Sequence, residues 1–411
     1  MKVVVTHDGK QYVNHLLIAL CRQGWLVRFF TSFAANRYLS LARFVPSVYR
    51  QVRKREIVQV PTEYIRSFLP AFLLSRLAKG EYRVIRTAYS LFDHWVARQL
   101  RSNPSVDLVI GYENSSLVTF QEAKRLGIVT VLDLAQVHHQ VLDAIRSQFR
   151  INNLTDEQTA WVNDRKKQAL AVTDYVLSLS SIATHSLTRN QIDRSRIYEV
   201  NLGIDVQRFS VAPKPTDGRF RVLFVGTITY RKGVDLLLQT FKRLNLSNAE
   251  LTLIGPVGDG EELLSQCSGS IRHIPFLHHE ELVHHYQQAD VFVFPSYLDS
   301  WGQVVLEAMA CGTPVVVSEN TGAKDAVGQG GGFIVPVGNG QALAEKIQYI
   351  YDNRSEVARL GTEARRVAEK YTWEKYYQQI ADALTDIAGR EGIDATRFDR
   401  VASDTNKAAG S

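Results

Sequence analysis

Residues 291–317 read VFVFPSYLDSWGQVVLEAMACGTPVVV, and this stretch decides the fold. Val291–Phe294 is a short run of β-branched and aromatic residues, which is typical of a buried strand. Ser296–Gly302 interrupts that pattern, and Gln303–Cys311 restores a helical spacing of apolar residues. The Gly-Thr-Pro sequence that follows ends the helix before a second apolar run. The segment therefore predicts a strand, a loop, a helix and a strand.

A loop after such a strand is where open α/β sheets bind ligands, because the free amides of the next helix point outward there. We expect the amides of Gly302, Gln303 and Val304 to hold a diphosphate. Glu307 lies about one turn further along the helix, where a carboxylate can accept both hydroxyls of a ribose. Asp299 stays on the loop and can reach a sugar.

The two acids also allow a simpler interpretation, in which Asp299 caps the helix and Glu307 pairs with a lysine. Glu307 lies in an otherwise apolar segment, and a buried carboxylate needs specific partners. We therefore prefer the ligand site.

A second motif, RVLFVGTITYRKGVDLLL, occupies residues 221–238. An apolar strand ends at Gly226, a short loop carries Arg231 and Lys232, and an amphipathic helix follows. Cations held at the head of a helix add to the helix dipole and can clamp a phosphate. The motif alone is a weak signal, because Arg-Lys-Gly is common on exposed loops.

Together with NLGIDVQRF at residues 201–209, the two motifs resemble the retaining nucleotide-sugar glycosyltransferases of family GT4, which have the GT-B fold. The resemblance is strong from about Asp174 to Tyr377 and looser before it. It implies an α/β protein with two Rossmann-like domains that face each other across a deep cleft. The family usually has two glutamates separated by seven residues, and Asp299 and Glu307 match this spacing with an aspartate in the first place.

The resemblance implies that Glu307 binds the donor ribose, Asp299 contacts the transferred sugar and Lys232 binds the diphosphate. Thr227 stands where the family usually has an arginine, and a threonine cannot supply a planar cation to a leaving diphosphate. We expect Arg231 to take over that work. The further residues assigned to the donor site are Gly226, Thr227, Gly255, Pro256, Phe276, Ser300, Trp301, Gly302, Gln303 and Val304.

The 411 residues, 45% of them apolar, suffice for two cores. Residues 1–205 are assigned to a Rossmann-like domain on the acceptor side, and residues 206–372 to the domain that binds the nucleotide sugar. A helix at 373–388 is expected to cross back to the first domain. Residues 389–411 are polar and predict a disordered tail.

The first half begins with a strand at Lys2–Thr6, a turn, a helix at Tyr12–Arg22 and a second strand at Trp25–Phe30. No GxGxxG follows a strand, which argues against a nicotinamide enzyme. The residues proposed for the acceptor side of the cleft are Gly9, Lys10, Glu113, Asp133, His138 and His139. Family members often carry a histidine near Asp133, although a histidine pair is equally consistent with a surface position.

Five histidines lie between residues 273 and 285, in a segment whose counterpart in the family is a loop followed by a helix of surface character. We therefore expect no metal, and the chemistry implied by the family needs no cofactor besides the donor. Cys21, Cys267 and Cys311 are scattered and predict reduced thiols in a cytoplasmic protein. We see no signal peptide and no apolar run long enough to span a bilayer.

The segment Arg37–Arg101 holds 13 lysines and arginines against 4 aspartates and glutamates, a net charge of +9 that exceeds the +6 of the whole chain. Cations interleaved with aromatic residues suit an anionic membrane surface. We hypothesise that the first domain docks on the inner leaflet of the plasma membrane to reach a lipid-linked acceptor. The alternative is that ordinary amphipathic helices pack on the sheet. No motif supports a nucleic-acid partner.

The sequence therefore predicts a retaining glycosyltransferase that moves a hexose-type sugar from a UDP- or GDP-sugar to a glycan, glycolipid or lipid-linked acceptor in bacterial cell-surface biosynthesis. The resemblance implies departure of the diphosphate on the face where the acceptor attacks, with Lys232 and Arg231 stabilising its charge. An alternative, suggested by Thr227 and the missing histidine, is a non-catalytic subunit that binds a nucleotide sugar or a partner enzyme. An epimerase of the same fold fits the Asp299 motif less well.

Overall fold

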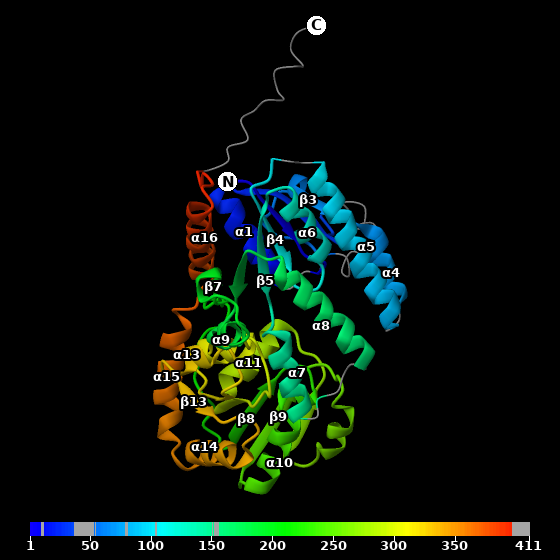
Figure 1. Cartoon of the computed structure of the whole chain (residues 1–411). Coiled ribbons are helices and arrows are strands. Elements are labelled where there is room, and N and C mark those ends of the chain that lie inside the picture. Colours follow the sequence, from blue (N-terminus) through cyan, green and yellow to red (C-terminus); the bar gives the residue numbers. More distant parts are fainter. Residues whose placement is uncertain are drawn as a thin grey trace, which may run out of the picture. The chain divides into compact units, whose positions relative to one another are not determined.

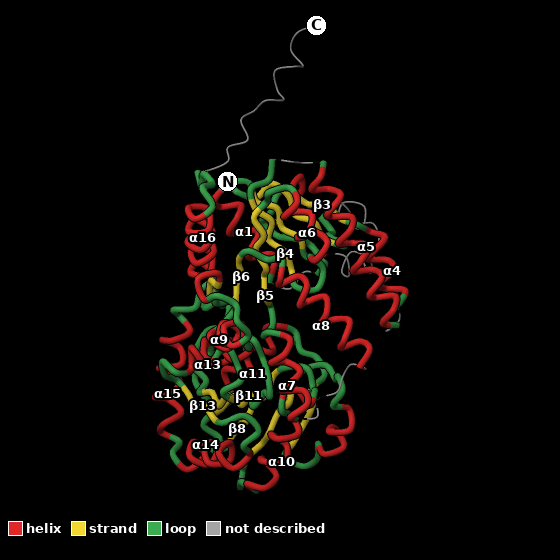
Figure 2. The backbone as a smooth tube through the Cα atoms, in the orientation of Figure 1, coloured by secondary structure: helices red, strands yellow, loops and turns green. Residues whose placement is uncertain are grey.

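The computed structural model describes residues 1–9, 12–36, 53, 55–78, 81–102, 105–149, 151 and 156–396. Two parallel sheets, of seven and six strands, are enclosed by helices (Figures 1 and 2). The prediction of two Rossmann-like domains is confirmed at this level.

The first sheet has the order β3-β2-β1-β4-β5-β6-β7. Its strands are β1 (Val3–Thr6), β2 (Leu26–Thr31), β3 (Ile65–Ser67), β4 (Leu108–Tyr112), β5 (Val129–Leu134), β6 (Tyr175–Ser178) and β7 (Ile197–Glu199). The helices in this part of the chain are α1 (Val13–Gln23), η1 (Thr62–Tyr64), α4 (Leu69–Leu77), α5 (Tyr82–Arg101), α6 (Leu117–Arg125), α7 (His139–Gln148), α8 (Asp156–Ala171), α9 (Ser181–Arg189) and η2 (Arg194–Arg196).

The second sheet has the order β10-β9-β8-β11-β12-β13. Its strands are β8 (Phe220–Val225), β9 (Ala249–Ile254), β10 (Ile271–Ile274), β11 (Val291–Phe294), β12 (Val315–Ser318) and β13 (Gly332–Val335). The helices are η3 (Tyr230–Lys232), α10 (Val234–Leu244), η4 (Glu261–Gln266), α11 (His279–Gln288), α12 (Gln303–Ala310), α13 (Lys324–Val327), α14 (Gly340–Asp352), α15 (Ser355–Ala368) and α16 (Trp373–Arg390).

The predicted strand, loop, helix and strand are present as β11, α12 and β12. All residues of β11 and β12 are buried, as expected of central strands covered on both faces. The rings of Phe224, Phe292 and Phe294 stack between β8 and β11. Helix α10 buries Val234, Leu237, Leu238 and Phe241, whose spacing of three and four residues lines one helical face.

Both sheets have a point at which the strand order reverses, between β1 and β4 in the first and between β8 and β11 in the second. The connections from these two neighbouring strands leave in opposite directions, so a crevice opens at their carboxyl ends. The loop after β8 carries Arg231 and Lys232, and the loop after β11 carries Asp299. The two predicted motifs thus meet at the reversal point of the second sheet.

Contacts divide the chain into two compact units. One comprises residues 1–134, 157–177 and 377–411, and the other comprises residues 135–156 and 178–376. This division differs from the predicted boundaries, because residues 135–156 and 178–205 join the second unit. Helix α16 is divided at Tyr377.

The predicted disordered tail is wrong for residues 389–396. Helix α16 continues to Arg390, and beyond it the Ala395 carbonyl accepts a hydrogen bond from the Trp25 indole N–H at 3.1 Å. The Met1 amino group donates to the Thr396 carbonyl at 3.0 Å. These contacts hold residues 395 and 396 beside the residues that precede β1 and β2. The composition of the segment did not indicate this packing. The rest of the predicted tail lies outside the described residues.

Candidate donor-binding site

The ammonium of Lys232 forms an ion pair with the carboxylate of Asp299, which joins the loop after β8 to the loop after β11. The same ammonium lies 4.9 Å from the centre of the Phe294 ring. Asp299 uses its second oxygen to accept the N–H of Trp301 at 3.1 Å. A hydrogen bond within its own loop and a charge partner from another loop therefore both hold Asp299 in place.

Three charges gather at this point. Burial acts to raise the pKa of Asp299, but Lys232, Arg231 and the Trp301 N–H together outweigh it, so the pKa of this carboxyl lies below its ordinary value. Burial lowers the pKa of the Lys232 ammonium, opposed by Asp299, and the charge of Arg231 lowers it further. The Arg231 guanidinium donates to the Leu298 carbonyl at 2.7 Å. Two cations thus share one carboxylate, which leaves an excess of positive charge.

The two loops touch through their backbones. Gly233 has φ 69° and ends η3, and a Cβ atom there would lie 2.1 Å from the carbonyl oxygen of Pro295. The Tyr297 N–H donates to the Arg231 carbonyl at 2.9 Å. No residue but glycine fits at position 233 without moving one of the loops, so the position of Lys232 depends on it.

Glu307 is half-buried on α12, and its carboxylate accepts a hydrogen bond of 2.8 Å from the hydroxyl of Tyr286 on α11. Burial raises the pKa of Glu307, opposed by Tyr286 and by the charge of Arg208. Its partner is therefore a fully buried tyrosine and not the lysine of the alternative interpretation. The hydrogen bond fixes one oxygen and leaves the second for other contacts.

Helix α12 begins after Gly302, which has no side chain to cap it. The side-chain amide of Gln303 donates to the Gly203 carbonyl at 2.8 Å, while its amide oxygen is buried without a hydrogen-bond partner. Trp301 is buried, and the Ser300 carbonyl accepts from Ser180 at 2.7 Å. The first amides of α12 therefore have no side-chain cap, as the prediction of a diphosphate site requires.

The remaining predicted donor residues surround these loops. Gly226 and Gly255 end β8 and β9, and their backbones pass so closely that a Cβ atom on Gly255 would lie 2.2 Å from the Gly226 carbonyl oxygen. Thr227, Pro256 and Phe276 are exposed, and Val304 is half-buried. The assignment of all these residues to donor binding stays a prediction.

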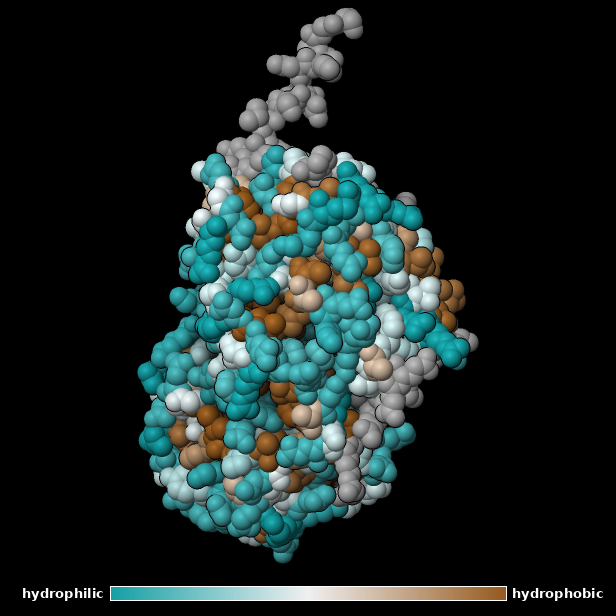
Figure 3. All heavy atoms as spheres, viewed as in Figure 1, coloured by the Kyte–Doolittle hydropathy of each residue, from teal (hydrophilic) through white to brown (hydrophobic). Residues whose placement is uncertain are grey.

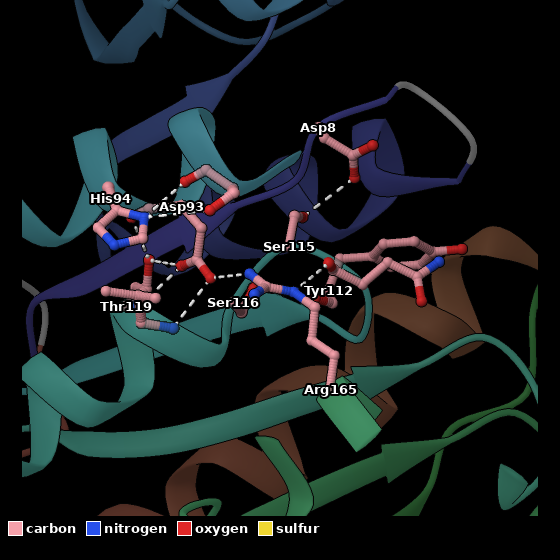
Figure 4. Close-up of polar contacts among 11 residues, drawn as sticks. Asp8, Asp93, His94, Tyr112, Ser115, Ser116, Thr119 and Arg165 are labelled. Atoms are coloured by element: carbon pink, nitrogen blue, oxygen red, sulfur yellow. Dashed lines mark hydrogen bonds and ion pairs between the residues drawn. The ribbon is translucent and has the colours of Figure 1, made fainter. Parts of the chain in front are cut away.

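In the first unit, Asp8 follows β1 and Ser115 follows β4, so they occupy the reversal point of that sheet. The Ser115 hydroxyl donates to the Asp8 carboxylate at 3.1 Å (Figure 4). Burial raises the pKa of Asp8, and the Ser115 hydroxyl opposes this. Gly9 lies beside them, but its N–H donates to the ring of His7 at 2.9 Å. Lys10, predicted with Gly9, lies outside the described residues.

Glu113 and Asp133, the acids predicted after β4 and β5, are both buried in this unit. Glu113 lies 3.4 Å from the Lys166 ammonium, and burial raises its pKa. Asp133 accepts from the Tyr12 hydroxyl at 2.8 Å, and burial raises its pKa to about 7, with the charge of Glu113 acting in the same direction. Each acid has one buried oxygen without a hydrogen-bond partner. Two coupled acids thus lie side by side near the reversal point.

Asp93 on α5 organises a separate polar network (Figure 4). Its carboxylate accepts the N–H groups of Val118 and Thr119 at 2.9 and 2.8 Å and so caps α6 from outside the helix. It also forms a buried ion pair with Arg165 of α8, whose Nε donates to the Asn114 carbonyl at 3.0 Å. The network ties three helices to the loop after β4.

His138 and His139, predicted for the acceptor side of the cleft or for the surface, are buried in the second unit. Their rings lie 4.2 Å apart, and the His138 ring accepts from the Gln140 N–H at the start of α7. The His138 N–H donates to Ser186 at 2.9 Å. The surface alternative is therefore wrong for both residues, and a contact with the donor stays a prediction.

Among the described residues, no group of three histidines, cysteines or acids gathers as a metal site would require, and no helix there is long and apolar enough to cross a bilayer. All three cysteines are free thiols, and only Cys311 is buried.

The sequence interpretation missed Tyr286, which orients Glu307, and Asp8, which directly follows β1 in the way that Glu113 follows β4. Asp8 had a signal, because a polar residue at the end of a central strand is a candidate in any open sheet. Tyr286 lies 21 residues from Glu307 on another helix, and no pattern in the sequence indicated that the two residues would meet.

Comparisons with known proteins agree with this geometry. Residues 205–367 match the model of the family described as "Glycosyl transferases group 1". D-inositol 3-phosphate glycosyltransferase from Geodermatophilus obscurus is 34% identical over 224 residues, which cover 48% of this chain and 48% of the relative. The chain thus spans about half the length of the curated relatives it matches.

Solved structures match over nearly the whole chain. Sucrose-phosphate synthase from Thermosynechococcus elongatus has a TM-score of 0.67 at 20% identity and covers 95% of this chain and 100% of its own. Anabaena HepE in complex with UDP has a TM-score of 0.66 at 17% identity, with coverage of 94% and 100%. The family model, which spans both the Lys232 motif and the paired acids, agrees with the resemblance that these motifs indicated. The chain has the GT-B fold, and its residues 205–367 are similar to the glycosyl transferases group 1 family.

Proposed function

We propose that this protein is a retaining glycosyltransferase that moves a hexose-type sugar from a nucleoside diphosphate sugar to a glycan, glycolipid or lipid-linked acceptor. The Lys232–Asp299 ion pair at the reversal point of the second sheet is the observation that carries the proposal. It places a cation and a carboxylate together at the carboxyl ends of β8 and β11, where this class of sheet binds ligands.

The donor exchanges partners with this ion pair. When a diphosphate arrives, the Lys232 ammonium turns from Asp299 to the phosphate oxygens, which carry more negative charge than one carboxylate. Asp299 is then released to accept a hydroxyl of the transferred sugar. A single change of partner thus gives both residues the roles that the family pattern implies.

Arg231 supplies the charge that Thr227 cannot. Its guanidinium acts electrostatically on both Lys232 and Asp299 and is held by the Leu298 carbonyl. As the bond to the sugar breaks, negative charge grows on the diphosphate, and the two cations beside it stabilise that charge more than they stabilise the intact donor. The acceptor hydroxyl attacks the anomeric carbon on the face from which the diphosphate departs, so no protein nucleophile enters the reaction. The departing diphosphate takes the hydroxyl proton, so no protein base is needed.

Glu307 recognises the ribose of the donor nucleotide. With one oxygen held by Tyr286, the other accepts the ribose hydroxyls. A UDP-sugar is the better supported donor, because HepE has been solved with UDP and with UDP-glucose, whereas a GDP-sugar rests on the family alone. The choice between bases would depend on the exposed Pro256 and Phe276.

The acceptor side is proposed to work at an anionic membrane surface, in cell-surface polysaccharide or glycolipid synthesis. Leu73 and Leu77 of α4 are 56% and 75% exposed, beside the basic residues of α4 and α5. Apolar atoms are visible where α4 lies at the right edge of the molecule (Figure 3). Exposed leucines among arginines suit a charged lipid headgroup region.

The function is tested by a thermal-shift screen against UDP, GDP, ADP and CMP and their sugar conjugates, without added metal. We expect a shift with UDP and UDP-sugars that is lost in Glu307→Ala and kept in Glu345→Ala, which removes an exposed acid from α14. Transfer is then measured with the UDP-sugar that shifts most.

A non-catalytic subunit is the second candidate, and the exposed Thr227 favours it. Such a protein would bind the nucleotide sugar, and Glu307→Ala would weaken binding, but neither hydrolysis nor transfer of the sugar would occur. A slow release of UDP from the donor by the purified protein, abolished in Lys232→Ala, argues for the enzyme.

A further inference from the structure

A pocket of about 240 Å³ in the first unit holds two arginines that no described carboxylate pairs with. Its walls come from the ends of β1 and β2, from the chain near Arg55, and from helices α4 and α5. The polar and charged lining residues are Asp8, Ser32, Arg55, Ser75, Arg76 and Tyr89.

The two arginines lie around one aromatic ring. The guanidinium carbon of Arg55 is 4.9 Å from the centre of the Phe72 ring, and that of Arg76 is 5.7 Å from it. Phe72 is itself stacked on Phe33 at 4.7 Å, so the ring is fixed. Burial lowers the pKa of Arg55, and the charge of Arg76 lowers it further. The fold therefore holds two like charges close together.

The backbone beside Arg55 is also fixed. The Ala35 N–H donates to the Arg55 carbonyl at 3.0 Å, and the side chain of Asn36 makes two hydrogen bonds to the backbone of Ile57, at 2.8 and 2.9 Å. A surface arginine that only solubilises the protein needs no such support. Two guanidiniums that line one pocket and pair with no described carboxylate match the charge of a phosphate group.

Asp8 also lines the pocket, at the reversal point of the sheet, with its carboxylate bonded to Ser115. Its charge acts on Tyr89, another lining residue. A carboxylate in the same pocket can accept a sugar hydroxyl while the arginines hold an anion. The volume suits a sugar phosphate rather than an oligosaccharide.

We propose that this pocket binds a phosphate group of the acceptor, with Arg55 and Arg76 on the phosphate and Asp8 on the sugar. The phosphate belongs either to a soluble sugar phosphate or to a lipid whose headgroup reaches the pocket. The assignment of the ligand as the acceptor rests on the proposed function, whereas phosphate binding in this pocket does not.

The test uses calorimetric titration of the full chain in phosphate-free buffer with saturating UDP to occupy the donor site. Glucose 6-phosphate and glucose are the soluble probes, and vesicles of phosphatidylcholine with and without phosphatidic acid are the lipid probes. The variants are Arg55→Gln and Arg76→Gln, and Arg83→Gln on α5 is the control because it removes the same charge from the same basic region.

We expect a phosphate-bearing probe to bind, glucose to bind much more weakly, and each pocket variant to lose at least about tenfold in affinity. Arg83→Gln should stay within about twofold of the wild type. If only phosphatidic acid vesicles show this pattern, the phosphate comes from a lipid, which supports the same site.

Equal losses in Arg83→Gln and the pocket variants would overturn the proposal, since the binding would then belong to a general basic surface. So would the absence of binding by every phosphate probe. The thermal shift with UDP keeps the two questions apart, because a protein that responds to UDP but to no phosphate probe refutes the pocket and leaves the donor site intact.

Discussion

Lys232 and Asp299 form an ion pair across the reversal point of the second sheet. The first sheet has a polar bridge at the corresponding place, where Ser115 donates to Asp8. At each site, a loop from one central strand is fixed to the loop from its neighbour by side chains that can also bind a ligand. The loops are therefore positioned before any ligand arrives.

Replacing Lys232 by alanine should reduce turnover by at least about a hundredfold, because the diphosphate loses a cation in the transition state. Initial rates with a UDP-sugar measure this, and Lys242→Ala on the exposed face of α10 is the control. Turnover within about threefold of the wild type would exclude Lys232 from the mechanism. Since Asp299 is left without its lysine, Lys232→Ala with Asp299→Asn should be more stable than Lys232→Ala alone.

Tyr286→Phe should weaken UDP binding about fivefold, because Glu307 loses a hydrogen bond of about 1 kcal/mol that orients it. Glu307→Ala should have a larger effect. Tyr349→Phe removes an exposed hydroxyl from α14 and should bind UDP as the wild type does. Titration calorimetry measures all three affinities, and an unchanged affinity in Tyr286→Phe would show that Glu307 needs no support.

The stability of the first unit should depend on pH through Asp133. Its pKa is raised by burial from 3.8 to about 7. Between these values the folded protein holds a proton that the unfolded chain has released, so the free energy of unfolding falls as the pH rises. Asp133→Asn does not ionise. Relative to the wild type, its stability should therefore rise between about pH 5 and about pH 8, by the order of a few kcal/mol.

Urea unfolding at the two pH values checks this difference. Asp164→Asn removes an exposed acid from α8, so its stability relative to the wild type should change little between the two pH values. An Asp133→Asn variant with the same pH dependence as the wild type would mean that Asp133 is ionised throughout this range.

Arg165→Met should destabilise the first unit by about 3–5 kcal/mol, because it leaves the buried Asp93 carboxylate without its cation. Adding Asp93→Asn should recover part of the loss, since the neutral amide can still accept the α6 N–H groups through its oxygen. Chemical denaturation measures both variants. A double variant less stable than Arg165→Met would show that capping by the charged carboxylate outweighs the cost of its burial.

Flotation with liposomes tests the membrane surface. The wild type should float with anionic vesicles and much less with neutral ones, because the basic residues of α4 and α5 need anionic lipid. Leu73→Ser with Leu77→Ser should lose at least half of the floating fraction, as both side chains are exposed. Failure of the wild type to float with either vesicle would end the docking hypothesis.

Local patterns predicted the second unit well. The strand, loop and helix around Asp299 and the Arg-Lys-Gly loop each have signals within about twenty residues, and parallel strands bring their ends together at one edge of the sheet. Composition was a poorer guide to the end of the chain, because residues 391–396 are polar but pack through backbone groups that composition does not reveal.

The partners of buried charges were beyond the sequence. Asp93 pairs with Arg165 across 72 positions, and Glu307 bonds to Tyr286 from another helix. Each of these residue types has many candidate partners in a chain of this length, and only tertiary packing selects one. In the sequence, Arg55 and Arg76 are two of thirteen cations in a basic region. Only the structure shows that both lie near the same ring, that of Phe72.

The close contact between Gly233 and the Pro295 carbonyl also constrains how the protein can evolve. A mutation at position 233 disturbs both loops at once, so the charges of Arg231, Lys232 and Asp299 are inherited as one block. Thr227, Pro256 and Phe276 are exposed around that block and can change without disturbing it. A lineage of such proteins can therefore change the rim of the proposed donor site by drift, while the two loops that carry these charges stay the same.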